Sequence, residues 1–179
     1  SYVNNQPRLE VLELPDQTAI QGPVQVHQRM TNNATVRSEL TLLSNRRGFK
    51  TLAQHALDAC KHRDKPATLL FFDLNDFKPI NDRYGHAEGD AALKTFADVL
   101  RIAFRESDVV GRLGGDEFVA LLTGSSHVET TRIMARLKEI LEERNATLHR
   151  GYEIRFSVGQ IEYDPTRHET VDRLLADAD

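Results

Sequence analysis

Residues 111–118 read Gly-Arg-Leu-Gly-Gly-Asp-Glu-Phe, and short apolar runs lie on both sides of them, at 109–110 and 118–122. Two strand-like runs that are joined by a glycine pair predict a β-hairpin. Glycines without side chains let a ligand approach the backbone closely, and the adjacent carboxylates of Asp116 and Glu117 can hold a metal ion. The stretch therefore predicts a phosphate and metal site at the tip of a hairpin. A plain turn with solvated acids is the alternative.

The composition of the whole chain is that of one globular domain. Its 179 residues, 40% of them hydrophobic and 28% charged, are enough to bury a core. The net charge of −4 argues against nucleic acid as a partner, because such surfaces need a basic excess. The chain begins with Ser1, so we expect a piece of a longer protein. Its apolar runs are too short to cross a membrane. We therefore expect a cytoplasmic domain whose parent protein is free to carry a membrane anchor.

The chain divides into two parts. Residues 1–36 hold three of the six prolines and are expected to form a linker or the end of an upstream module. Residues 37–179 show clear periodicity and are expected to form the main folded domain. We expect helices at 46–62, 77–84, 90–104, 127–143 and from 170, and strands at 69–72, within 108–122 and at 152–158. Helices that alternate with strands predict one α/β (α+β) domain with helices packed on a mixed sheet.

Two residue types need a separate reading. Cys60 lies on the apolar face of the helix expected at 46–62, so we expect a buried core thiol. His86 follows Gly85 at the end of a short helix, and a structural role is expected for it. The other six histidines show no metal-ligand spacing and are expected on the surface.

A second stretch, residues 72–82, places Asp73 directly after the apolar run 69–72. A carboxylate at the edge of a buried strand is costly unless it is paired or bound to a cation. Two alternatives need no cation. Asp73 can be solvated at the strand end, or Asp73 or Asp76 can cap the helix that follows.

Further separated motifs agree with the hairpin stretch. The run Phe-Asp-Leu-Asn-Asp-Phe-Lys-Pro-Ile-Asn-Asp at 72–82 precedes Gly-His at 85–86 and Gly-Asp at 89–90, and the hairpin stretch follows in the right order. Asn-Arg-Arg-Gly-Phe at 45–49 and Ser-Val-Gly at 157–159 also match. Over residues 38–179 the chain resembles the GGDEF family, the diguanylate cyclases, which join two GTP molecules into cyclic di-GMP. The resemblance implies a palm-like nucleotidyl cyclase fold with a mainly antiparallel central sheet and the motif on a hairpin.

The resemblance also implies a metal site for Mg²⁺ or Mn²⁺. The Asp73 carboxylate and the Leu74 carbonyl would bind the ion, and Asp116 and Glu117 would approach from the hairpin. Adjacent residues of a strand point to opposite faces. Both acids can therefore reach the ion only if Asp116 sits in the turn. Asp116 would act as base or as ligand, Glu117 would join it in catalysis, and Lys78 would stabilise phosphate charge.

By the same resemblance, Asn81 and Asp90 would read guanine, and Phe77 would belong to the substrate site. Gly114 and Gly115 would let the nucleotide pass close to the backbone. The alternatives are a helix-end role for Asn81, a helix N-cap role for Asp90 and a solvated lysine at 78.

An Arg-x-x-Asp motif, Arg105 to Asp108, stands before the hairpin at the spacing of the family's inhibitory product site. An Arg fork and an Asp acceptor can bind guanine or phosphate. The alternative is an exposed ion pair at a helix end, which would contribute little.

The reaction implied is attack of one GTP 3′-hydroxyl on the α-phosphate of another, across a homodimer interface. The implied partners are GTP, cyclic di-GMP and an upstream sensory domain. One alternative is a catalytically silent module that binds GTP or cyclic di-GMP and regulates an attached phosphodiesterase. Another is a different palm-like nucleotidyl transferase, although Asn81 with Asp90 counts against an ATP enzyme.

Two features depart from the family pattern. Ser38 and Leu42 stand where the family has Asp and Gly. Ser38 can still cap a turn, but Leu42 cannot easily take a positive φ, so we expect a different local backbone. The family also continues beyond residue 178 with basic residues that contact phosphate.

Overall fold

The computed structural model describes residues 37–178 of the chain. Its elements, in chain order, are α3 (Arg46–His62), β1 (Ala67–Leu74), α4 (Phe77–Tyr84), α5 (His86–Ala103), β2 (Val109–Gly114), β3 (Glu117–Thr123), α6 (His127–Leu148), β4 (Phe156–Glu162) and α7 (Val171–Ala178). The linker or upstream module expected at 1–36 lies outside the described residues.

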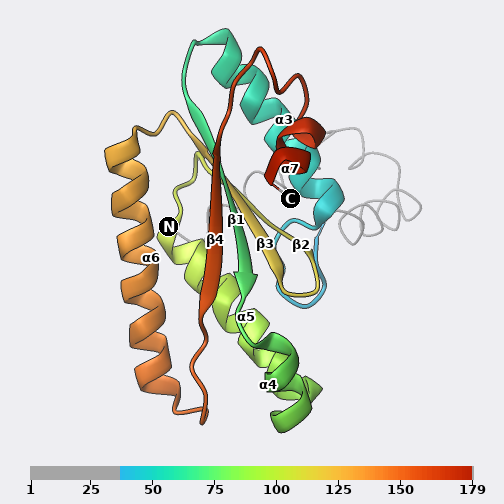
Figure 1. The fold of residues 1–179 in the computed structure, drawn as a ribbon, viewed down its shortest axis with the longest axis vertical. Helices are drawn as coiled ribbons and strands as arrows, with labels where there is room; N and C mark the ends of the chain where they lie inside the picture. The colour runs from blue at the N-terminus through green and yellow to red at the C-terminus, as the bar shows by residue number, and fades with distance from the viewer. Residues whose placement is uncertain (1–36, 179) are drawn as a thin grey trace, which may run out of the picture.

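The strands form a four-stranded sheet in the order β2-β3-β1-β4, and every neighbouring pair is antiparallel. This confirms the expected α/β class with a mainly antiparallel central sheet. Helices lie on both sides of the sheet (Figure 1). β1 sits between β3 and β4, which explains why its residues 67–70 are all buried. Among the described residues, no helix has the length and apolar character that a membrane crossing requires.

Side chains of β1 alternate between two cores. Leu70, Phe72 and Leu74 join the core formed with α5 and α6. Leu69 and Phe71 pack on the opposite side with α3 and α7. Because side chains two residues apart share a face, Asp73 lies on the α3 and α7 side.

Aromatic rings fill the centre of the core on the α5 side. The ring of Phe72 lies 5.9 Å from that of Phe96 and 6.2 Å from that of Phe104, and Phe96 lies 5.0 Å from Phe118. All are edge-to-face contacts, the geometry that aromatic pairs prefer. This cluster fixes the register of β1 against β3 and α5.

Several element boundaries differ from those expected. α6 extends to Leu148 rather than 143, and β1 spans Ala67–Leu74 rather than 69–72. α5 begins at His86 rather than near 90, since Gly85 with φ 92° links it directly to α4. Asp90 is therefore inside the helix, and its alternative role as an N-cap is excluded. β4 begins at Phe156 rather than 152. The Asn145 side chain occupies both backbone groups of Ile154, at 2.9 Å each, so this residue cannot join the ladder.

The turn at 38–43 corrects the expectation for Leu42. Leu42 adopts φ 63°, the left-handed conformation that the sequence argued against. Backbone bonds between Leu42 N–H and Ser38 O and between Ser38 N–H and Leu43 O, both 2.8 Å, hold the turn. The Ser38 hydroxyl accepts from Thr41 N–H at 3.5 Å, so Ser38 caps the turn as expected. A left-handed leucine costs about 1–2 kcal/mol.

Cys60 is buried as expected, and burial raises the pKa of its thiol. The surface assignment of the histidines was wrong for His168, which is 3% exposed. Its Nδ1 accepts from Asp164 N–H at 3.0 Å, and its Nε2 lies 2.7 Å from an Asp177 carboxylate oxygen. Two hydrogen-bonding partners compensate for the burial of the ring.

Candidate functional site

Two carboxylates face each other at one end of the sheet. Asp73 of β1 and Glu117 of β3 are direct partners in the antiparallel register. Partners of this kind lie on the same face, with β-carbons about 5 Å apart. Neither their 44-residue separation in sequence nor their spacing within each motif reveals this pairing. The register of β1 against β3 creates it.

Asp116 lies outside the pleated ladder. Gly114 pairs with Glu117, so Gly115 and Asp116 form the two-residue turn of the β2–β3 hairpin. The condition for Asp116 and Glu117 to approach one ion is thereby met. Leu74 N–H donates to the Asp116 carbonyl at 3.3 Å, which ties the turn to the end of β1.

The glycines of the hairpin allow the turn conformation and leave the backbone of the turn accessible. Gly115 has φ 47°, a conformation that glycine adopts without steric cost. A β-carbon built at Gly114 or Gly115 would meet no atom of the described residues within 4 Å. The backbone of the turn is therefore open to close approach from outside.

The acidic end of the sheet fits a metal that shares its ligands with a substrate. Within residues 37–178, no group of three or more His, Cys, Asp or Glu side chains is arranged to hold an ion. Opposed carboxylates such as Asp73 and Glu117 repel each other, and a cation relieves that repulsion. Mg²⁺ is commonly held by one or two carboxylates together with substrate phosphates. The residues present fit that arrangement.

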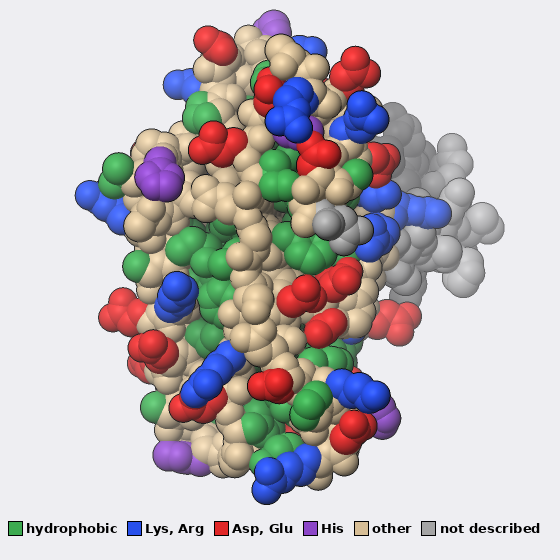
Figure 2. All heavy atoms as spheres, in the orientation of Figure 1, with side chains coloured by type: hydrophobic (Ala, Val, Ile, Leu, Met, Phe, Trp, Pro, Cys, Tyr) green, Lys and Arg blue, Asp and Glu red, His purple; other side chains and the backbone are tan. Residues whose placement is uncertain are grey.

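Basic side chains adjoin these acids. Arg46 and Lys50 of α3 line a cavity of about 390 Å³ together with Glu117, and the Lys50 ammonium lies 2.7 Å from Asp172 of α7. Acidic side chains gather over the β2–β3 part of the face shown in Figure 2. The sequence reasoning did not single out Arg46 or Lys50, because only the fold brings α3 beside the end of β3.

The residues expected to read guanine come from two consecutive helices. Asn81 is half-buried on α4, and Asp90 is exposed on α5. Lys78 is exposed in the first turn of α4, and Phe77 is half-buried against the core on the α5 side. Within the described residues, the Asp76 side chain makes no capping hydrogen bond to α4. That alternative role for Asp76 is therefore not realised.

Arg112 is a site residue that the sequence reasoning missed. Its Nε donates to the Gly115 carbonyl at 2.9 Å, and its Nη1 donates to the Ser38 hydroxyl at 3.1 Å. Burial lowers the pKa of its guanidinium, while the charges of Asp90 and Asp116 oppose that shift. Arg112 thus links the turn to the 38–43 segment, within reach of the charge of Asp90. Its position four residues before Asp116 was the available signal.

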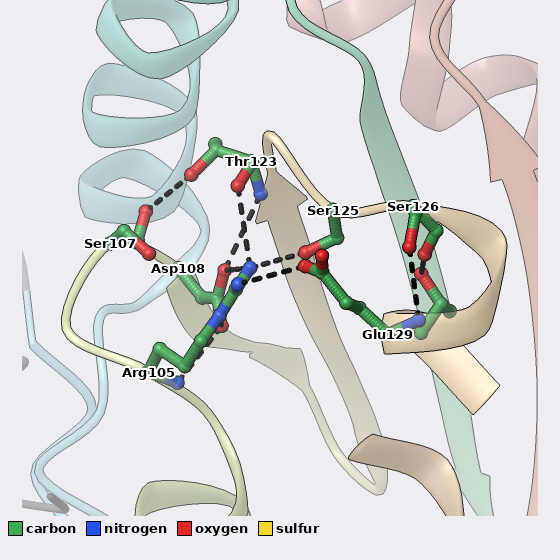
Figure 3. Close-up of polar contacts among 8 residues, drawn as sticks. Arg105, Ser107, Asp108, Thr123, Ser125, Ser126 and Glu129 are labelled. Atoms are coloured by element: carbon green, nitrogen blue, oxygen red, sulfur yellow. Dashed lines mark hydrogen bonds and ion pairs between the residues drawn. The ribbon is translucent and has the colours of Figure 1, made fainter. Parts of the chain in front are cut away.

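Arg105 and Asp108 lie at the other end of β3 (Figure 3). The Asp108 carboxylate is 0% exposed and accepts from the Arg105 backbone N–H at 2.9 Å, from Arg105 Nε at 3.2 Å and from Nη2 at 3.0 Å. The alternative of an exposed ion pair is therefore wrong for Asp108. The hydrogen bond that the Arg105 side chain donates to the Asp108 carboxylate raises the pKa of the Arg105 guanidinium.

The same arginine joins three segments. It donates to the Thr123 carbonyl and to the Ser125 hydroxyl, and its Nη1 lies 3.5 Å from Glu129 of α6. Thr123 ends β3, six residues from Glu117. Since a strand rises about 3.3 Å per residue, this cluster is about 20 Å from the carboxylate end. Any ligand at Arg105 would therefore occupy a second site.

Comparisons with known proteins agree with this geometry. Residues 36–179 match the family model described as diguanylate cyclase, GGDEF domain. The probable diguanylate cyclase DgcC of Escherichia coli K12 is 34% identical over 139 residues, which are 78% of this chain and 38% of DgcC. The chain thus spans well under half the length of that relative.

Two further proteins are similar. The cyclic di-GMP phosphodiesterase NbdA of Pseudomonas aeruginosa is 40% identical over 113 residues, 61% of this chain and 14% of NbdA. The solved structure of the isolated GGDEF domain of TpbB, also called YfiN, from Pseudomonas aeruginosa is 34% identical. It covers 79% of this chain and 83% of its own, with a TM-score of 0.69.

Proposed function

Because this chain belongs to the GGDEF-domain family of diguanylate cyclases, we propose that it is the catalytic part of an enzyme that converts two GTP into cyclic di-GMP and two pyrophosphates. The observation that carries the proposal is the cross-strand pair of Asp73 and Glu117, with Asp116 in the adjoining turn. A silent module has less need of three acids at one end of the sheet.

The chemistry assigns a role to each group at that end. The 3′-oxygen of one GTP forms a bond to the α-phosphorus of the other, and the bond to the departing pyrophosphate breaks. Asp116 lies in the turn, where it can accept the hydroxyl proton or serve as a ligand. A divalent ion held by Asp73, Glu117 and the Leu74 carbonyl would neutralise phosphate charge and lower the pKa of the attacking hydroxyl.

The remaining groups position the substrate. Lys78, exposed in the first turn of α4, supplies positive charge to the phosphates. The open backbone at Gly114 and Gly115 lets the nucleotide lie against the turn. Asn81 and Asp90 hydrogen-bond to guanine, and Phe77 packs beside them. Arg46 and Lys50 offset the charge next to Glu117.

Catalysis needs two copies of the chain, since one copy offers one such site and the reaction joins two GTP. A two-fold dimer brings two identical sites face to face. Specific activity should therefore rise with protein concentration, and an upstream sensory domain can control the reaction by controlling dimerisation. We place the reaction in the cytoplasm, where GTP is available.

Product inhibition is proposed at Arg105. The guanidinium is 39% exposed although Asp108 is not, so cyclic di-GMP would be bound first through the exposed edge of Arg105. The variant Arg105→Lys keeps the charge and removes the planar fork. It should weaken product inhibition while turnover at low product concentration is retained. Unchanged inhibition would remove Arg105 from this role.

Product analysis tests the activity. The protein is incubated with GTP and Mg²⁺ at high concentration, beside Glu117→Gln and the matched control Glu139→Gln, an exposed glutamate of α6. We expect cyclic di-GMP from the unchanged protein and the control but not from Glu117→Gln. GTP binding without product, at every protein concentration, would favour the silent regulatory module, in keeping with the similarity to a phosphodiesterase.

A further inference from the structure

We infer that Gly89 determines base specificity, because its missing side chain gives the Asn81 amide its place against α5, next to Asp90. The inference rests on the proposed GTP site and deepens it. It adds a position to the guanine-reading pair that touches neither the base nor the phosphates.

The contact is closer than any side chain at position 89 allows. A β-carbon built at Gly89 would lie 2.8 Å from Asn81 Cγ and 3.3 Å from its Nδ2, and closer still to Oδ1. Real β-carbons essentially never approach a heavy atom within 3.0 Å. With any other residue at 89, the Asn81 side chain must move.

Backbone conformation does not explain the glycine. Gly89 is a buried residue of α5 and is absent from the positive-φ residues of the described chain. Its N–H donates to the Gly85 carbonyl at 3.1 Å as in a regular helix. Glycine is a poor residue inside a helix, so the space for Asn81 is the physical reason for it.

The two helices cannot easily separate to make room. A single residue, Gly85, joins them, and its N–H donates to the Asn81 carbonyl at 2.9 Å. Glu88, next to Gly89, lies 2.7 Å from Arg150 Nη1 and accepts from the Tyr152 hydroxyl at 2.9 Å.

These bonds hold the start of α5 against the segment before β4. The Asn81 side chain, with two rotatable bonds, is therefore the part that gives way. A methyl group at 89 would move one polar group of the site and leave the fold in place.

The effects of Asn81 and Asp90 on base recognition can then be measured separately. The Asn81 amide can donate and accept, so in the proposed site it can pair with base atoms that distinguish guanine from adenine. The Asp90 carboxylate accepts from N–H groups, which include the 2-amino group of guanine. Inosine triphosphate lacks that amino group, so discrimination against it reports on Asp90. Discrimination against ATP reports on both Asn81 and Asp90.

The test uses the whole chain and four variants, Gly89→Ala, Asn81→Ala, the double variant and Gly159→Ala. Gly159 is the matched control, because a β-carbon there would meet no described atom within 4 Å. Calorimetry measures binding of a non-hydrolysable GTP analogue with Mg²⁺, and of the ATP and inosine counterparts.

We expect Gly89→Ala to weaken GTP-analogue binding about tenfold, the effect of one lost hydrogen bond. The preference over ATP should fall by a similar factor, while the preference over the inosine analogue stays unchanged. Asn81→Ala should have the same effect, and the double variant should lose nothing further. Gly159→Ala should bind as the unchanged protein does.

Thermal unfolding provides a readout that does not depend on nucleotide. In the Asn81→Ala background the space at position 89 is free, so Gly89→Ala should raise Tm by about 4 °C through helix propensity. In the unchanged background the gain should be smaller.

Additive losses in the double variant, or unchanged binding by Gly89→Ala, would overturn the inference while the proposed function stands. Binding with the expected coupling but no cyclic di-GMP would overturn the proposed function alone.

Discussion

Removal of the Asp108 carboxylate should destabilise the domain strongly. Its side chain is 0% exposed and accepts four N–H groups, three from Arg105 and one from Thr123 at 3.4 Å. Breaking a buried ion pair by removing one partner typically costs about 3–5 kcal/mol. Arg105 is 39% exposed and regains water when its partner is lost. We therefore expect Asp108→Ala to lower the free energy of unfolding by about 3 kcal/mol.

Urea unfolding followed by circular dichroism measures this loss. At constant m-value, the midpoint should fall in proportion to the lost free energy, and Tm should fall by roughly 10 °C. Ser107→Ala is the matched control. Ser107 contributes its backbone carbonyl, which accepts from the Thr123 hydroxyl at 2.8 Å and is kept in alanine. The control should stay within about 0.5 kcal/mol of the unchanged protein.

The result decides how inhibition experiments on this motif are read. If Asp108→Ala unfolds at nearly the same urea concentration as the unchanged protein, the buried cluster does not stabilise the domain, and the reasoning from burial is refuted. A loss near the expected size means that Asp108→Ala disturbs the fold at this end of β3. Arg105→Lys is then the better variant for testing product inhibition.

Three further predictions concern the core, the α4–α5 unit and the turn. Phe72→Ala should cost about 3–5 kcal/mol, since it leaves a cavity in the aromatic cluster, and urea unfolding would show it. Arg150, then Tyr152, hold the pKa of Glu88 below its ordinary value. The stability from this pair should be present at neutral pH and lost as pH falls below about 4.5. Unfolding of Arg150→Gln should thus converge with the unchanged protein in acid, and a constant difference down to acid would contradict the assignment. Gly115→Ala should destabilise by about 1 kcal/mol because of its φ of 47°, and an unchanged Tm would contradict it.

Local patterns predicted much of the fold. α3 and α4 occupy the ranges 46–62 and 77–84 that the sequence predicted. The predicted start of β4 was wrong because Tyr152 and Ile154 alternate with polar residues as strand residues do. Tertiary partners, Glu88 and Asn145, decide their conformation. Leu42 shows the same effect, since backbone bonds of its turn override the preference of leucine.

The sequence identified the residues of the candidate site better than their arrangement. It pointed to Asp73, Asp116 and Glu117, but the register partnership of Asp73 with Glu117 comes from long-range pairing. It also could not show that Asp108 is buried, because spacing says nothing of what covers a helix end. The role inferred for Gly89 depends on the packing of two helices, which no local pattern encodes.

The most direct test of the central claim is to locate the metal and nucleotide on the protein. Crystals grown with Mn²⁺ and a non-hydrolysable GTP analogue would show the ion by its anomalous scattering. We expect the ion between the carboxylates of Asp73 and Glu117, and the guanine base against Asn81 and Asp90. An ion or nucleotide bound elsewhere, with the Asp73 and Glu117 carboxylates away from it, would contradict the account.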